Sequence, residues 1–129
     1  MRKTYTVDSG VQNGSDIRFL LQEDPADHEV KAAGQIITDS DGQAFVYLMD
    51  DTDGYTYIRF PKTVWPLLAA SLGADKEPVL TWGQTDILLD QFREELSMLI
   101  FNIEGNHNYG EEFSSAVEEA FKEQLATSE

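Results

Sequence analysis

The chain has 129 residues, with 24 acidic and 9 basic side chains and a formal net charge of −15 at pH 7. This charge balance disfavours direct binding to nucleic acid or to an anionic membrane, because phosphate contacts need clustered Lys and Arg. The sequence contains no cysteine, which excludes disulfides and thiolate chemistry. The length suits one domain, and we predict a single domain over residues 1–129 with residues 126–129 frayed.

The expected location is cytoplasmic. No run of about 18 apolar residues occurs, so no segment is predicted to span a membrane. The N-terminus begins with basic residues but lacks the apolar stretch of a secretion signal.

The first third of the sequence is patterned as strands and turns. Short β-prone runs occupy Thr4–Val7 and Ile17–Leu21, and the turn residues between them predict a hairpin or meander. A polar loop over residues 23–29 precedes a third predicted strand, Val30–Thr38. The turn cluster at residues 39–42 ends this strand.

Residues 43–72 form the stretch around which we expect the chain to be organised. Both faces of Ala44–Met49 are apolar, so this strand is predicted to be central and covered on both sides. An acidic turn leads to a second aromatic strand, Tyr55–Phe60. A helix then follows, with Thr63 predicted as its N-cap and Gly73 just beyond its end.

The last part of the sequence predicts a second hairpin and two helices. The hairpin joins Glu77–Trp82 to Thr85–Leu89, and Asp90 is the predicted N-cap of the next helix. The final helix covers residues 111–125, and Asn108 lies at capping-box spacing from its start. The apolar stripe of the first of these helices is Phe92, Leu96, Leu99, Ile100 and Ile103.

These elements predict an α+β fold. Strands joined by short turns indicate an antiparallel β-sheet of about five to seven strands, and helices collected near the end indicate packing on one side. Residues 90–129 carry ten acidic and two basic side chains, a net charge of −8, so the helical third is the acidic part.

No catalytic, metal or cofactor motif emerges. The sequence lacks a Gly-x-Ser-x-Gly elbow and a glycine-rich phosphate loop. His28 lies in a polar loop, and His107 has only Glu111 as a nearby second ligand, which is too few for zinc. The Asp-rich turns at residues 39–42 and 51–54 lack the terminal glutamate of a calcium loop. We therefore predict no metal and no cofactor. A structural role for calcium at the Asp-rich turns ranks third, after the two functional hypotheses given below.

Aromatic and polar side chains near the predicted turns are the candidates for a ligand site or an interface. Tyr55 and Tyr57 share a strand face and, with Tyr47, are expected to form an aromatic surface. Trp65 and Trp82 either line a ligand groove or pack in the core. The full candidate set is Tyr55, Tyr57, Trp65, Trp82, His107, Asn108 and Tyr109.

The run AFVYLMDD…YTYIRFPKTVWPLL, followed by QFREELSMLIFNIEGNHNYGEEF, resembles a small uncharacterised protein family of Bacillus-like Gram-positive bacteria. The resemblance covers residues 43–121. It implies a cytosolic bacterial protein and carries over no catalytic residue, because the family has no assigned activity. His107 stands where the family pattern has a small residue, which argues against a catalytic His107.

Two functional hypotheses follow from the sequence. The first is a non-enzymatic cytosolic protein that acts through protein contacts, either with a basic partner or as a homodimer. An inhibitor or immunity-type protein that covers a basic nucleic-acid enzyme is its specific form, with binding that weakens in salt. The alternative is a small-molecule-binding protein or an unrecognised enzyme, with its site in a pocket beneath the Asn106–Gly110 loop.

Overall fold

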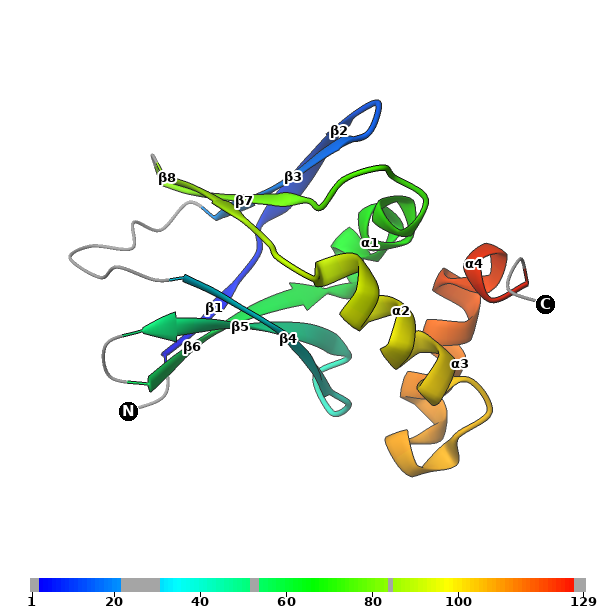
Figure 1. The fold of residues 1–129 in the computed structure, drawn as a ribbon. Coiled ribbons are helices and arrows are strands. Elements are labelled where there is room, and N and C mark those ends of the chain that lie inside the picture. The colour runs from blue at the N-terminus through cyan, green and yellow to red at the C-terminus, as the bar shows by residue number, and fades with distance from the viewer. Residues whose placement is uncertain (1–2, 22–30, 52–53, 84, 127–129) are drawn as a thin grey trace.

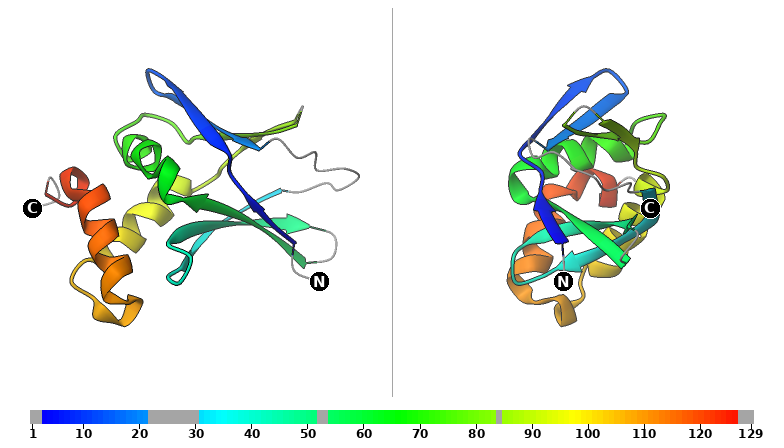
Figure 2. Two further views of the ribbon diagram at one scale, coloured as in Figure 1. Left: turned by 180° about the vertical axis from the view of Figure 1, so that it is seen from behind. Right: turned by 90° about the vertical axis from the view of Figure 1, so that its left-hand side faces the viewer.

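The computed structural model describes residues 3–21, 31–51, 54–83 and 85–126. Within these residues, eight strands form two sheets and the helices gather at one end of both (Figures 1 and 2). The strands are β1 Lys3–Thr6, β2 Ser9–Asn13, β3 Asp16–Leu21, β4 Lys31–Asp39, β5 Ala44–Asp51, β6 Gly54–Pro61, β7 Val79–Trp82 and β8 Thr85–Leu88. The helices are α1 Trp65–Leu72, α2 Phe92–Ile103, α3 Glu111–Ala120 and α4 Lys122–Ala126, with 3-10 turns η1 Lys62–Val64 and η2 His107–Tyr109.

Sheet A has the strand order β1-β6-β5-β4, and sheet B has the order β2-β3-β7-β8. The pairs β1–β6 and β3–β7 are parallel, while the other neighbours are antiparallel. The predicted α+β class is therefore confirmed, although the strands divide into two mixed sheets instead of one antiparallel sheet. The division begins at Val7, whose N–H donates to Arg59 in sheet A, while the next N–H, of Asp8, donates to Leu20 in sheet B.

The hairpin predicted between Thr4–Val7 and Ile17–Leu21 is wrong. The first segment lies in β1 beside β6, and the second lies in β3, where it pairs with the unpredicted strand β2. Strand β2 is an edge strand of mostly exposed residues, so its sequence shows no apolar alternation. Its pairing comes from the backbone, which turns at Asn13-Gly14 as a hairpin does.

Strand β5 is the central strand that the sequence predicts. Its residues from Ala44 to Met49 are all buried, and it pairs with β4 on one side and β6 on the other. Directly opposed residues of an antiparallel pair share a face, and Tyr47 lies opposite Ile58 while Leu48 lies opposite Tyr57. Tyr47 therefore faces the core, and the expectation of one surface shared by Tyr47, Tyr55 and Tyr57 is wrong.

Phe92, the first residue of α2, joins the two sheets. Its ring centroid lies 6.1 Å from Phe19 of sheet B and 5.3 Å from Phe60 of sheet A. Phe19 and Phe60 also meet edge to face at 4.9 Å. Aromatic pairs at such distances add about 0.5–1.5 kcal/mol each to the free energy of burial. This cluster makes the two sheets share one core.

A second aromatic cluster attaches the helices to sheet A. Phe45 of β5 packs against Trp65, Phe113 and Phe121, with ring centroids 5.2, 5.9 and 5.8 Å away. The predicted stripe of α2 is confirmed, because Phe92, Leu96, Ile100 and Ile103 are fully buried and Leu99 is packed against the core.

The predicted N-caps of the helices are wrong, whereas Gly73 follows α1 directly, as predicted. The N-cap residues of α1, α2 and α3 are Val64, Gln91 and Gly110, and none of them makes a side-chain cap hydrogen bond. Thr63 instead lies in the η1 turn that precedes α1. At the start of α2, a distant residue supplies the acceptor, because Glu77 Oε1 accepts from the Arg93 N–H at 3.0 Å. The final predicted helix is divided at Phe121 into α3 and α4.

The Tyr47 hydroxyl connects α2 to the edge strand β4. It donates to the carbonyl oxygen of Asp90 at 2.7 Å and accepts from the Gly34 N–H at 3.2 Å. Gly34 has φ of +73° and lies where the β4–β5 register shifts between Ala32 and Ile36. A bulge at a glycine thus turns a backbone N–H toward a buried side chain.

Tyr47→Phe removes both hydrogen bonds while keeping the ring. We expect the free energy of unfolding to fall by about 1–3 kcal/mol, because two backbone groups lose their partner. Urea unfolding measures the change. Tyr55→Phe is the matched control, since Tyr55 is 49% exposed, and its effect should stay within about 0.5 kcal/mol. Equal effects of the two substitutions would contradict the role of the Tyr47 hydroxyl.

Stability at alkaline pH provides a second test of Tyr47. Burial raises the pKa of Tyr47 above its ordinary value of 10.0, so the folded protein retains a proton that the unfolded chain releases. The contribution of Tyr47 to the stability of the folded protein is fully present below pH 10.0 and is lost as the pH rises above that value. The stability difference between the parent chain and Tyr47→Phe should therefore narrow above pH 10.0 in urea titrations. A widening difference would have the wrong sign.

The two tryptophans differ in the state of their indole N–H. Trp65 Nε1 donates to the Phe60 carbonyl oxygen at 3.0 Å, whereas Trp82 Nε1 is buried without a hydrogen-bond partner among the described residues. Both residues are 1% exposed, so Phe removes a similar volume from the core at each position. We expect Trp65→Phe to be more destabilising than Trp82→Phe by about 1–2 kcal/mol in urea unfolding. Equal losses would show that the Trp65 hydrogen bond adds nothing.

Candidate binding cleft

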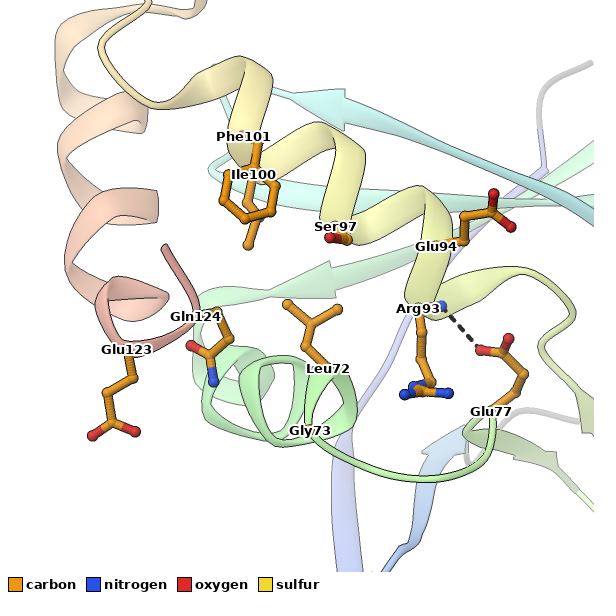
Figure 3. A pocket seen from close by; sticks show the side chains of 10 residues that line it. All are labelled: Leu72, Gly73, Glu77, Arg93, Glu94, Ser97, Ile100, Phe101, Glu123 and Gln124. Atoms are coloured by element: carbon orange, nitrogen blue, oxygen red, sulfur yellow. Dashed lines mark hydrogen bonds between the residues drawn. The ribbon is translucent and has the colours of Figure 1, made fainter. Parts of the chain in front are cut away.

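A cleft of about 660 Å³ lies where α1, α2 and α4 meet (Figure 3). Its position follows from the aromatic clusters, because Phe92 fixes the start of α2 while Phe113 and Phe121 fix α3 and α4. The lining residues are Leu72, Gly73, Glu77, Arg93, Glu94, Ser97, Ile100, Phe101, Glu123 and Gln124.

Helix α2 supplies half of the lining. Arg93, Ser97, Ile100 and Phe101 are spaced by four, three and one residues, so they lie on one side of the helix. Ile100 is fully buried, whereas Phe101 remains 39% exposed. This side of α2 is a flank of its core-facing stripe, and α1 and α4 enclose it.

Arg93 and Gln124 hold the walls of the cleft together. The Nε of Arg93 donates to the Ser71 carbonyl oxygen at 2.9 Å, which ties α2 to the last turn of α1. A cation at a helix C-terminus also interacts favourably with the helix dipole. Gln124 Nε2 donates to the Ala69 carbonyl oxygen at 3.0 Å and ties α4 to α1. The cleft is therefore enclosed by walls connected through side chain to backbone bonds.

The lining combines apolar and acidic side chains. The apolar residues that line the cleft are Leu72, Ile100 and Phe101, and the acidic ones are Glu77, Glu94 and Glu123. Arg93 is the one cation among the lining residues, so three carboxylates and one guanidinium give a net charge of −2. Glu94 and Glu123 are exposed, while Glu77 is half-buried and accepts from the Arg93 N–H, as Figure 3 shows.

This arrangement suits binding of a ligand with an apolar part and positive charge. Carboxylates beside an apolar surface attract a cation and also bury the apolar group to which it is attached. Ser97 is the single hydroxyl among the lining residues, and no His or Cys accompanies it there. Across the part of the chain that the structure describes, no group of three His, Cys, Asp or Glu side chains could hold a metal ion.

The two tryptophans of the predicted site are core residues at separate places. The ring of Trp65 in α1 packs against Phe113 of α3, with ring centroids 6.0 Å apart. The ring of Trp82 instead meets Tyr5 edge to face, with ring centroids 4.9 Å apart. Both are 1% exposed. The structure therefore supports the core-packing interpretation of Trp65 and Trp82, and neither belongs to the cleft.

The remaining candidates lie on the outer face of sheet A and in the Asn106–Gly110 connection. Tyr55 is 49% exposed, and Tyr57 is half-buried in a smaller hollow of about 190 Å³ beside Arg59. Tyr109 packs 6.5 Å from Phe113, and the N–H of Asn108 donates to Asn106 Oδ1. His107 begins η2, and its side chain lies outside the described part of the structure.

None of the residues that line the cleft was among the site candidates predicted from the sequence. One signal was available, because Phe101 is a large apolar side chain of α2 that lies outside the predicted stripe. An exposed aromatic residue beside a core-facing stripe is a candidate contact residue. The other walls come from the end of α1 and from α4, which only the folded chain brings together.

No helix within the described residues is both long enough and apolar enough to cross a membrane. Comparison with known proteins places the chain among bacterial relatives. A family described as "Family of unknown function (UPF0738)" matches residues 5–121. No solved structure gave a significant match.

Three relatives come from Gram-positive bacteria. The UPF0738 protein of Lysinibacillus sphaericus is 43% identical over 126 residues, which cover 98% of this chain and 99% of that protein. The relative from Staphylococcus haemolyticus is 42% identical and covers 80% of this chain and 84% of its own length. The relative from Geobacillus kaustophilus is 37% identical, and the match covers 96% of this chain and 100% of that protein. The resemblance predicted from residues 43–121 is thus confirmed, and the chain belongs to the UPF0738 family, a family of unknown function.

Proposed function

We propose that this chain is a cytoplasmic binding protein whose α1–α2–α4 cleft holds a basic, amphipathic segment of a partner protein. The observation that carries the proposal is the joining of an apolar lining, Leu72, Ile100 and Phe101, to three carboxylates within one cleft. A segment with apolar side chains on one side and Lys or Arg beside them matches both parts of this lining.

The charge of the surrounding helices supports a basic partner. Residues 90–126 carry nine acidic and two basic side chains, so the cleft lies in the most acidic part of the chain. Such a field raises the association rate of a basic partner and is screened by salt. An acidic or neutral segment would gain no such attraction.

The apolar lining supplies the contact that salt does not weaken. Phe101 is 39% exposed in the free protein, so a partner side chain that covers it removes apolar surface from water. Aromatic residues are frequent among the side chains that dominate binding energies. Phe101 is therefore the expected main contact, and Glu94 and Glu123 set the preference for positive charge.

A small organic cation is the second candidate ligand. The cleft volume of about 660 Å³ falls within the range of small-molecule sites, roughly 300–1,000 Å³. Benzylamine is a suitable probe, because it joins an aromatic ring to one ammonium group. Saturable benzylamine binding that Phe101→Ala abolishes, without binding of a basic peptide, would favour this alternative.

Binding of a defined peptide tests the proposal. A fluorescein-labelled amphipathic helix of Leu and Lys should bind the full chain, while the corresponding Leu and Glu peptide should not. Glu94→Gln with Glu123→Gln should weaken binding about fivefold in fluorescence anisotropy, since two exposed ion pairs contribute roughly 0.5 kcal/mol each. Phe101→Ala should weaken it about tenfold, and the remaining affinity should depend on salt as before.

Matched controls separate the cleft from the overall charge. Glu111→Gln with Glu112→Gln removes the same charge from exposed positions of α3 outside the cleft and should change affinity less than about twofold. Met98→Ala truncates an apolar side chain that is 50% exposed on α2 but does not line the cleft. Equal losses in the variants and the controls would sink the proposal. A protein captured from cytosol supports it only if capture follows the same order of variants.

A further inference from the structure

The outer face of sheet B, turned away from the core, carries a row of three apolar side chains and one arginine. The strand register places Val11, Arg18, Val79 and Leu88 side by side across β2, β3, β7 and β8. Val11 is 52% exposed and Leu88 is 53% exposed, the highest values among the large apolar side chains of the described residues. The core-facing side chains of the same strands, such as Phe19 and Leu80, are fully buried.

The charges on this face are balanced. Arg18 Nη1 lies 2.9 Å from Asp86 Oδ1 and donates to Thr81 Oγ1 at 2.7 Å. The Thr81 hydroxyl in turn donates to Asp86 Oδ1 at 2.8 Å. A second pair joins Lys76 to Asp16 at the start of β3. The two ion pairs join two bases to two acids and so contribute no net charge, on a chain whose net charge is −15.

We propose that the outer face of sheet B is the interface of a homodimer, with a second copy of this chain as its occupant. Two chains that each carry −15 repel one another, and a neutral apolar face is where that repulsion is weakest. A basic partner gains no net attraction there, which distinguishes this face from the acidic cleft. The occupant that matches a neutral face is therefore another neutral face.

The central charged pair makes the face self-complementary. Two copies related by a twofold axis present the same surface to each other, so residue i of one meets residue j of the other and the reverse. An axis near the Arg18–Asp86 pair brings Arg18 of each copy to Asp86 of the other. The four charges then alternate in sign, and the flanking Val11 and Leu88 cover apolar surface on the opposite copy.

The dimer and the cleft predict opposite responses to salt. Added salt screens the repulsion between two acidic chains but leaves apolar contacts in place, so dimerisation should tighten. Binding of a basic peptide in the cleft should weaken under the same conditions. The two surfaces have no residue in common, so each can fail without the other.

Sedimentation equilibrium of the full chain at low and high salt tests the dimer. The expected result is a monomer–dimer equilibrium that shifts toward dimer as salt is added. Leu88→Lys should raise the dissociation constant at least about tenfold, because it places a charge in the apolar row. Met98→Lys and Tyr55→Lys are matched controls at side chains 50% and 49% exposed, and they should leave the dimer intact.

Charge exchange tests the pairing itself. Arg18→Asp and Asp86→Arg should each give a monomer, because like charges then meet across the axis. Mixing the two variants should restore a dimer, since each then offers the charge that the other lacks. A merely structural role of the Arg18–Asp86 pair would not produce this complementation.

A monomer at every concentration and salt would overturn the inference, as would equal effects of Leu88→Lys and Met98→Lys. Peptide binding measured on the Leu88→Lys variant keeps the two proposals apart. A monomeric variant that still binds the basic peptide supports both proposals. A dimer that binds no peptide retains the homodimer and removes the proposed function of the cleft.

Discussion

The start of α2 is held between the two sheets, and the rest of the structure depends on that position. Phe92 contacts Phe19 and Phe60 from opposite sheets, and the Tyr47 hydroxyl binds the carbonyl oxygen of Asp90 just before the helix. These contacts set the direction of α2, because aromatic packing holds the side chain of its first residue and a hydrogen bond holds the backbone just before it. The core-facing side of α2 then meets sheet A, and its flank from Arg93 to Phe101 forms one wall of the cleft.

Strong periodicity in the sequence was sufficient to predict the central strands and the stripe of α2. Each of these elements buries so many side chains that its apolar pattern is visible in the sequence whichever elements pack against it. Strand β2 lacked such a pattern, because it is a polar edge strand held by backbone pairing. The predicted N-cap of α2 failed for a related reason, since the acceptor at the start of that helix is Glu77, which lies far from the helix in sequence. Local spacing carries no information about such a partner.

The candidate site was harder to predict than the fold. Trp65 and Trp82 drew attention because large amphipathic rings are frequent in ligand sites, yet the same size makes them effective core residues. No residue of the cleft belongs to a recognisable sequence motif. The cleft combines carboxylates with an apolar surface only because the fold brings these residues together. The β7–β8 hairpin separates Glu77 from Glu94 in sequence, and the rest of α2 and all of α3 separate Glu94 from Glu123. Only the packing of α4 against α1 places their carboxylates beside Leu72 and Phe101.

The uneven distribution of charge gives the two proposed surfaces different physical roles. Acidic residues are concentrated on the helices, whereas the two ion pairs of sheet B, at the proposed dimer interface, carry no net charge. A dimer through sheet B leaves both clefts with their full lining, because the two surfaces share no residue. In the proposed dimer, two clefts would bind two basic segments of one partner with a raised effective concentration. Weak binding at each cleft is then compatible with tight binding by the dimer, and salt acts on the two steps in opposite directions.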